Sequence, residues 1–480
     1  MTTLRDTTSA DAGSASAPSS NQALAAALQA AQWTPRELVR ALNPRLEAAG
    51  QPTLHPTAGR AWLNGAQPRS ATVRRLTATV LTEATGTPFT AAGLWGERAA
   101  TGAKAEKTAT DDLLGRRSIA DVLDTATAWT ATDPHEQAIL HPAGDSQLLS
   151  AVWDATRQNA RPILAPGGQE QVLPAFVDVL EGHLGRLRRL DDTAGGGALS
   201  QRYVRTELAG VLGLLRHGTY STDVGTRLLA TASGMAQLAG WMAFDADLHA
   251  AAQRYQLLAI RLARAADDTT TVGNVLGMLA YQHAAAGKPA AALRYAEAAV
   301  DHTTRSSPLV RARAWGRMAT AHAAAGDITA FRDATDRCRI LLERRRDDDP
   351  PSLYYFTPEQ VSAEAGHALV ELAAATPAHT RRLLTEATTL LSPLTDHGPT
   401  SGFPRSALLH GIHLARAHLL ARDPDSTAAT LLQLADHVPD VQSIRCRNLL
   451  RHIRRLAGTR MRSADRAHAL TAVDRALSAS

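Results

Sequence analysis

Three histidines lie close together near the C-terminal end of the chain, and histidine is a common ligand for zinc and a common proton carrier near neutral pH. They are His410, His413 and His418, at spacings of three and five residues. A zinc pair on a helix needs two histidines four residues apart with an acidic side chain nearby, as in HExxH. This spacing does not fit, so we expect packing or surface histidines and no metal site.

Sites built on glycine or cysteine have little support. Pro166-Gly167-Gly168 and Gly195–Gly197 lack the Lys-Ser/Thr that follows a phosphate-binding loop, or the strand that precedes it. The two cysteines, Cys338 and Cys446, form neither a CxxC pair nor a disulfide framework, which indicates a reducing compartment. No GxSxG or Cys/His constellation is visible. The sequence therefore predicts a protein that is not an enzyme and that needs no cofactor.

The charge distribution is compatible with phosphate binding near the N-terminus. The 480-residue chain has a formal net charge of +5. Between residues 21 and 96, seven arginines oppose three glutamates, so most of the excess lies in one small segment. A local basic excess is compatible with binding to phosphates. An arginine-rich surface that is only solvated is the alternative.

The composition predicts that helices position these side chains. Alanine, leucine and arginine, which favour helices, dominate the sequence, and aromatic residues make up 4% of it. Runs of β-branched residues, which would support strands, are almost absent. We therefore expect an all-α fold, divided into two or three units because of its length. No stretch of about 18 apolar residues could span a bilayer, so we expect a cytoplasmic protein.

The chain is predicted to contain five segments. Residues 1–20 are rich in alanine, serine and threonine and have no apolar core of a secretory signal, so we expect a disordered tail. Residues 21–96 should form a helical unit, followed by a linker over 97–117. A helical connecting segment over 118–200 should end at a flexible point, Gly195–Gly197. Residues 201–480 are expected to form an array of helical repeats.

The array is predicted from turns in a fixed register. Ala246-Asp247, Gly287 and Gly326 are spaced by 41 and 39 residues, with two large residues and a small one before each turn. This is the pattern of TPR-like helical hairpins, although the usual TPR repeat is about 34 residues long. Two looser hairpins are expected, Pro358–Ala375 with Ala378–Ser392 and Pro404–Ala421 with Ser426–His437. Val441–Ala457 should cap the array.

The unit over 21–96 is expected to be a helical bundle with a helix-turn-helix pattern. Leu24 and Leu28 predict the first helix. Thr34-Pro35-Arg36-Glu37 is a capping box that should begin a second helix through Leu42, followed by an insert over 43–53. The segment His55–Gly65 comes next, and a further helix is expected over 71–85.

Trp62 and Gly65 give the segment His55–Gly65 the ending of a known recognition helix. The segment resembles the XRE-type (Cro/repressor-like) helix-turn-helix, in which a buried tryptophan near the end of the recognition helix is followed by glycine. Two features depart from the family. Gly59 stands where the family has a buried valine or isoleucine, at a cost of roughly 1 kcal/mol in a helix interior. The insert also turns the family's tight turn into a loop.

The resemblance implies a role for several side chains. In such domains the recognition helix enters the major groove with its N-terminal residues near the bases. By this resemblance His55, Thr57 and Arg60 face base edges, and Arg60 could make a bidentate contact to guanine through two of its guanidinium nitrogens. Gln67, Arg69 and Arg36 would hold phosphates. The implied DNA-binding set is His55, Thr57, Arg60, Asn64, Gln67, Arg69 and Arg36.

A second resemblance covers most of the chain. The stretches LRRLDD (187–192), LRHGTYS (215–221), AQLAGWMAFD (236–245) and AQRY (252–255) resemble the actinomycete TPR-containing transcriptional regulators, which carry an XRE-like helix-turn-helix in front. Some members repress sporulation and antibiotic production. The resemblance implies a regulator of secondary metabolism or differentiation that binds a double-stranded operator as a homodimer. The alternative is a TPR interaction scaffold with a degenerate helix-turn-helix that does not read DNA.

The concave side of a TPR-like solenoid is its expected ligand surface. The first-helix positions that should face it are Asn274, Tyr281, Arg313 and Thr320. An asparagine and an arginine there could hold a peptide backbone or a carboxylate, so we expect a peptide or small-molecule effector. Ordinary solvated groove residues are the alternative for each position.

Overall fold

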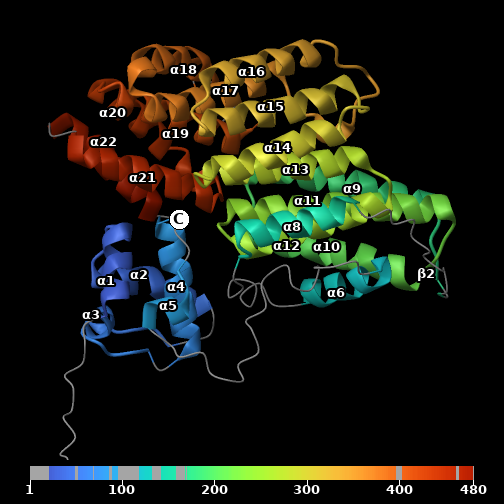
Figure 1. Ribbon diagram of the computed structural model, residues 1–480, viewed down its shortest axis with the longest axis horizontal. Helices are drawn as coiled ribbons and strands as arrows, with labels where there is room; N and C mark the ends of the chain where they lie inside the picture. Colours follow the sequence, from blue (N-terminus) through green and yellow to red (C-terminus); the bar gives the residue numbers. More distant parts are fainter. Residues whose placement is uncertain are drawn as a thin grey trace, which may run out of the picture. The chain divides into compact units, whose positions relative to one another are not determined.

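The computed structural model describes residues 21–48, 52–68, 70–85, 89–95, 118–131, 142–157, 168, 170–395, 403–460 and 464–478. These residues form 21 α-helices and a single pair of two-residue strands, which confirms the all-α fold (Figure 1). The chain divides into two compact units, residues 1–106 and 107–480. The expected tail over 1–20 and linker over 97–117 lie outside the described residues. No helix in the described part of the chain is both long and apolar enough to cross a membrane.

The first unit is a bundle of five described helices. They are α1 (Gln22–Ala31), α2 (Pro35–Ala48), α3 (Ala58–Leu63), α4 (Ala71–Thr85) and α5 (Ala91–Trp95). Leucines recur on one face of α1, α2 and α4 and form the core together with two tryptophans, Trp62 and Trp95. The capping box is confirmed, because the Thr34 backbone donates to Glu37 Oε2 at 2.7 Å and the Glu37 backbone donates to Thr34 Oγ1 at 3.3 Å.

The predicted insert after Leu42 is wrong in its first half, because α2 continues to Ala48. Leu46 extends the buried series of Leu38 and Leu42 by one more turn, and burial of this face favours helix over loop. Asn43 also fixes the following loop, since its side chain donates to the Leu54 carbonyl at 3.1 Å and accepts from the Leu54 backbone at 2.8 Å.

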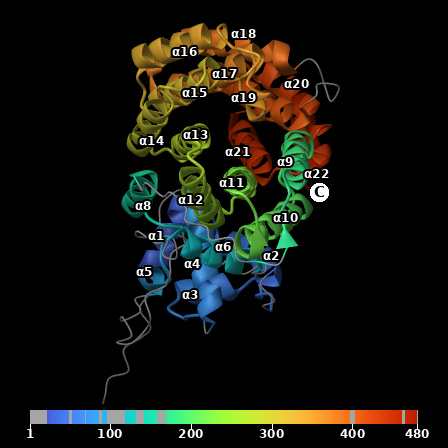
Figure 2. The same cartoon turned by 90° about the vertical axis from the view of Figure 1, so that its right-hand side faces the viewer.

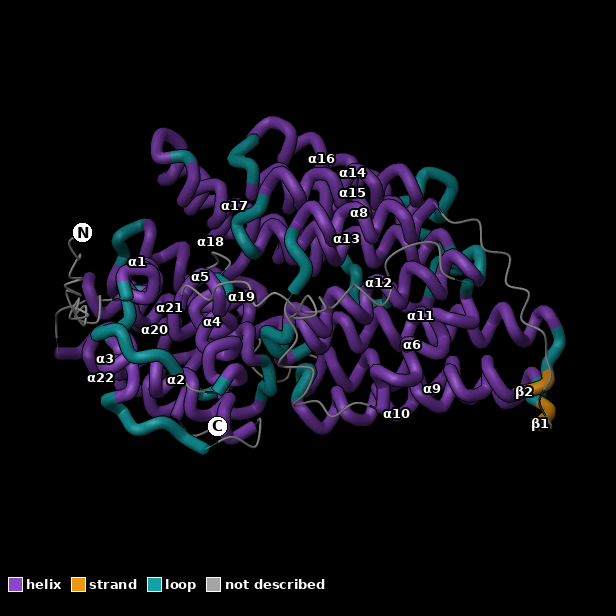
Figure 3. Tube along the Cα trace, turned by 60° about the horizontal axis from the view of Figure 1, so that its bottom comes forward, coloured by secondary structure: helices purple, strands orange, loops and turns teal. Residues whose placement is uncertain are grey.

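The second unit is a long succession of helices. Its helices are α6 (Ile119–Ala131), α8 (Asp145–Arg157), α9 (Pro174–Ala194), α10 (Ala198–His217), α11 (Thr222–Asp245), α12 (His249–Ala265), α13 (Thr269–Ala285), α14 (Pro289–His302), α15 (Pro308–Ala324), α16 (Ile328–Leu342), α17 (Pro358–Ala375), α18 (Thr380–Thr395), α19 (Pro404–Leu420), α20 (Pro424–Ala435), α21 (Ile444–Arg460) and α22 (Ala464–Ser478). Strands β1 (Glu170–Gln171) and β2 (Gly218–Thr219) pair in parallel at one end of the α9–α10 hairpin (Figure 3).

The predicted turns separate helices that pack as antiparallel pairs. Asp247, Gly287 and Gly326 have φ angles of +58°, +69° and +76° and lie between α11 and α12, α13 and α14, and α15 and α16. This left-handed conformation closes helix ends and favours glycine. The two looser hairpins are also present, as α17 with α18 and α19 with α20. The first helices of successive hairpins pack on one another along the array.

Both ends of the array differ from the prediction. The boundary expected at residue 200 falls inside α10, and α6, α8 and α9 share one hydrophobic core with α10, α11 and α12. Gly195–Gly197 is a packed turn: a Cβ on Gly195 would lie 2.9 Å from the Gln442 carbonyl oxygen, and one on Gly196 3.0 Å from Met242. The predicted cap corresponds to α21, but α22 follows it and packs against α20.

The two ends of the second unit meet. Helix α9 packs against both α11 and α19, and α21 packs against the same two helices (Figure 2). The Gln442 backbone donates to the Ala194 carbonyl at 2.9 Å. The side of the array lined by α11 and α19 is therefore covered by α9 and α21, and it is not the open concave groove expected of a solenoid.

Candidate nucleic-acid surface and ligand pocket

Helix α3 presents one buried and one exposed face. Trp62 is buried and meets Trp95 edge-to-face, with ring centroids 6.2 Å apart. Gly65 ends the helix with a φ angle of +94°, which glycine adopts most easily. On the other face Thr57, Arg60 and Asn64 are exposed, and their spacing of three and four residues places them along one side.

Gly59 is explained by a close backbone approach. A Cβ at this position would lie 2.4 Å from the Pro35 carbonyl oxygen at the start of α2. A valine or isoleucine, as in the XRE pattern, would push α3 away from α2. The glycine therefore fits this bundle, and it brings the first turn of α2 next to α3.

Arginines surround the contact between α2 and α3. Arg36 directly follows Pro35 and Arg60 directly follows Gly59, and Arg40 lies one turn further along α2. All three side chains are exposed, and none forms an ion pair with a described residue. Arg45 differs, because its guanidinium is 2.6 Å from the Glu83 carboxylate. The free arginines provide positive charge at the surface, as phosphate binding requires.

The remaining predicted DNA-binding residues differ in their hydrogen-bond partners. His55 is exposed and its Nδ1 is 2.8 Å from Thr57 Oγ1, so the two side chains form one polar pair before α3. Gln67 is exposed, but its amide donates to the Trp95 carbonyl at 3.0 Å and helps to anchor α5. Arg69 lies outside the described residues.

The four predicted groove residues do not form one site. Asn274 and Arg313 line the same pocket, whereas Thr320 lines a second hollow beside Glu364 and donates to the Gly316 carbonyl at 3.2 Å. Tyr281 lies in neither. Its hydroxyl accepts from Arg445 Nη1 at 2.6 Å, so α21 occupies the position expected for a ligand.

Buried charges hold α21 and α19 against α11. The Asp245 carboxylate is fully buried, with Arg445 Nε at 3.2 Å and Arg405 Nη1 at 3.7 Å. Arg445 also lies over the rings of Trp241, Phe244 and Tyr281, at 5.3–5.6 Å from their centroids. Burial alone would lower the pKa of Arg445, but attraction to Tyr281 and Asp245 raises it above its ordinary value.

Two of the three predicted histidines belong to a buried cluster with His367. His410 Nδ1 is 3.1 Å from His367 Nε2, and the His367 and His413 rings stack with centroids 4.0 Å apart. Burial lowers the pKa of His410 to about 4, and burial with the nearby Arg416 charge lowers that of His413 to about 3. These rings are therefore neutral at pH 7. His418 lies apart from them, and no group suited to a metal ion is found among the described residues.

The cysteines are buried thiols in helix contacts. Burial raises the pKa of Cys338 to about 12 and also raises that of Cys446, so neither is a reactive thiolate at neutral pH. Of the two glycine-rich stretches, Pro166 and Gly167 lie outside the described residues.

The prediction missed part of the pocket around Asn274 and Arg313. Arg188, Gln237, Arg317 and Ser352 also line it. Arg317 could have been found, since it lies one helical turn after Arg313. Arg188 and Ser352 come from α9 and from the loop before α17, which no repeat pattern places next to α13.

No protein family model matches the chain, and no curated protein matches it.

Proposed function

We propose that the protein is a DNA-binding transcriptional regulator whose first unit contacts double-stranded DNA through α3 and the start of α2. The observation that carries this proposal is the group of exposed arginines, Arg36, Arg40 and Arg60, without ion-pair partners among the described residues around the α2–α3 contact. The resemblance to XRE-type regulators supports the same assignment.

Side chains of α3 would contact base edges, and side chains of α2 would contact phosphates. Arg60, Thr57 and Asn64 share one side of α3, where a helix in the major groove would place them against bases. Arg36 and Arg40 lie on α2 and would bind the phosphate backbone, which gives affinity without sequence preference. The second unit acts as the sensor and dimerisation part. A two-fold operator would then be read by two copies of α3, and sedimentation of the full chain measures whether it is a dimer.

The experiment starts from a duplex selected by the full chain out of a random-sequence pool. Gel shifts then compare the selected duplex with a scrambled one at several salt concentrations. Arg60→Ala should cost about 1–3 kcal/mol on the selected duplex and reduce discrimination between the two. Arg344→Ala, at an exposed arginine of the second unit, is the matched control and should change neither affinity. Equal binding to both duplexes by the unaltered protein would contradict sequence-specific regulation.

An interaction scaffold is the second candidate, and the short length of α3 and the long segment before it favour this alternative. The helix has only six residues, and nine residues separate α2 from α3, where a helix-turn-helix has a turn of three or four. If Arg60→Ala combined with Thr57→Ala leaves DNA affinity unchanged, the scaffold becomes the better proposal.

A further inference from the structure

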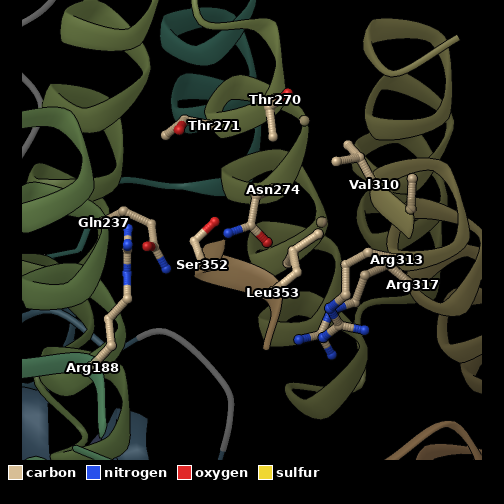
Figure 4. A pocket seen from close by; sticks show the side chains of 13 residues that line it. Arg188, Gln237, Thr270, Thr271, Asn274, Val310, Arg313, Arg317, Ser352 and Leu353 are labelled. Carbon is tan, nitrogen blue, oxygen red and sulfur yellow. The ribbon is translucent and has the colours of Figure 1, made fainter. Parts of the chain in front are cut away.

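A polar pocket lies among α9, α11, α13, α15 and the loop before α17. It is partly open to solvent. Arg188 and Gln237 point into it from one side and Arg313 and Arg317 from the other, with Asn274 and Ser352 between them (Figure 4). Three arginines thus line one pocket, although like charges repel strongly where water is scarce.

The carboxylates near this pocket are already used. Glu364 lies 2.9 Å from Arg313 Nη1 and accepts from the Gln360 side chain at 3.0 Å. Asp192 is 3.1 Å from Arg405 and accepts from the Tyr354 hydroxyl. Asp268 caps α13 and accepts from the Thr271 backbone at 2.9 Å. Glu364 therefore serves both Arg313 and Arg317, and no carboxylate in the described part of the chain forms an ion pair with Arg188.

The arginines retain unused positive charge and unused donors. Arg188 is partly buried and forms no hydrogen bond or ion pair with a described residue. Arg317 is 6% exposed, and its nearest carboxylate oxygen, on Glu364, is 3.8 Å away. Arg313 Nη2 is buried without a hydrogen-bond partner in the described part of the chain. Burial lowers the pKa of Arg188, although attraction to Asp268 and Asp192 acts in the opposite direction. Burial with the Arg313 charge lowers the pKa of Arg317, although Glu364 attracts it.

Neutral donors complete the lining. The Asn274 and Ser352 side chains form no hydrogen bond within the described residues, and Thr270 belongs to the first turn of α13, whose helix dipole favours anions. A buried donor without a partner, such as Arg313 Nη2, costs about 1–3 kcal/mol, so an acceptor that enters the pocket stabilises it. Several donors and excess positive charge are complementary to an oxyanion with more than one acceptor oxygen.

We propose that this pocket binds the carboxylate or phosphate group of a small organic anion. Arg188 and Arg317 approach the anionic group from opposite sides, and Asn274 and Ser352 donate to its remaining oxygens. As the effector site of a regulator the pocket depends on the proposed function, but anion binding itself does not. The fold also disfavours an extended peptide as the effector, because α9 and α21 cover the inner side of the array where such a peptide would lie.

The test measures anion binding by the full chain without DNA, so its failure is separate from any failure of the DNA-binding proposal. Inorganic phosphate and succinate are titrated by calorimetry and in thermal unfolding, at an ionic strength held constant with sodium chloride. Arg188→Gln removes one cation and no ion pair, so its fold should be retained. Arg186→Gln, two residues away on α9 and exposed, makes the same charge change outside the pocket.

We expect phosphate or succinate to raise the melting temperature of the unaltered protein and of Arg186→Gln, and the stronger of the two identifies the anion class. Arg188→Gln should bind that anion about tenfold more weakly or worse, as for the loss of one charge-assisted hydrogen bond. Its melting temperature without added anion should equal or exceed that of the unaltered protein, because repulsion is relieved. The proposal is overturned if chloride alone gives the same shift, or if Arg188→Gln binds as tightly as Arg186→Gln.

Discussion

Three exposed arginines of the first unit and two buried arginines of the second are used in opposite ways. In the first unit Arg36, Arg40 and Arg60 are exposed and lack ion-pair partners among the described residues. In the second unit Arg405 and Arg445 are buried against carboxylates and aromatic rings. The same type of side chain therefore offers charge to solvent at the first three positions and joins helices at the other two. The number of arginines in a unit does not distinguish these roles. They are distinguished by the groups that each guanidinium contacts.

The largest effect should come from Arg445→Met. This change leaves the buried Asp245 carboxylate with Arg405 alone, at 3.7 Å. Breaking a buried pair on one side costs about 3–5 kcal/mol, because an uncompensated charge remains. Urea unfolding followed by circular dichroism would measure the free energy of unfolding of the second unit. Arg36→Met is the control and should change stability by less than about 0.5 kcal/mol. Equal, small effects of both changes would remove the contrast between the units.

A smaller effect is expected from the histidine cluster as pH falls. The pKa of His410 is about 4 in the folded protein and near its ordinary value of about 6.5 when unfolded, so the unfolded state binds the proton first. The free energy of unfolding is therefore highest above about pH 6.5 and decreases as pH falls. At pH 5 this residue alone should lower it by about 2 kcal/mol. Burial raises the pKa of Asp191 to about 6, and this acts in the opposite direction.

His410→Gln tests that expectation, because glutamine can still form a hydrogen bond with His367 but does not titrate. Its free energy of unfolding should fall less between pH 7.5 and pH 5 than that of the unaltered protein. His379→Gln, at an exposed histidine, should behave like the unaltered protein. An identical pH dependence in all three proteins would show that folding does not lower the pKa of His410.

The smallest effect on stability is expected where charge faces solvent. Arg36→Ala with Arg40→Ala should leave the free energy of unfolding within about 0.5 kcal/mol. The same change should weaken binding to selected and scrambled duplexes alike. It should also reduce the slope of log K against log salt by about 0.9 for each lost phosphate contact. An unchanged slope would mean that neither arginine contacts the DNA phosphates, and the proposed role of these exposed arginines would be wrong.

The helices and turns of this protein could be predicted from the sequence because their causes are local. Glycine or aspartate with positive φ ends the first helix of three hairpins, and the capping box at Thr34 begins α2. The length of α2 was underestimated because Asn43 and Pro44 suggest a break, whereas burial of Leu46 sustains the helix. Leu46 is four residues after Leu42, so this signal was present in the sequence.

The pocket could be predicted only in part, because it depends on contacts between distant segments. Asn274 and Arg313 follow from the repeat register, which places them on successive first helices. Arg188 comes from a segment expected only to connect the units. No periodicity indicates that α9 folds back against α11, and the expected open groove was wrong for the same reason. Tyr281 illustrates this, since its partner Arg445 is 164 residues away.

The covered inner side of the array has a consequence for folding. An open chain of repeats unfolds in steps, because each repeat contacts only its neighbours. Here Arg445 reaches Asp245 across 200 residues of sequence, and closing so long a loop adds an entropic cost before the contact stabilises anything. High contact order of this kind slows folding. Helices α11 and α21 should therefore lose their protection against hydrogen exchange together, and a chain truncated before α21 should also loosen the hairpin at the opposite end.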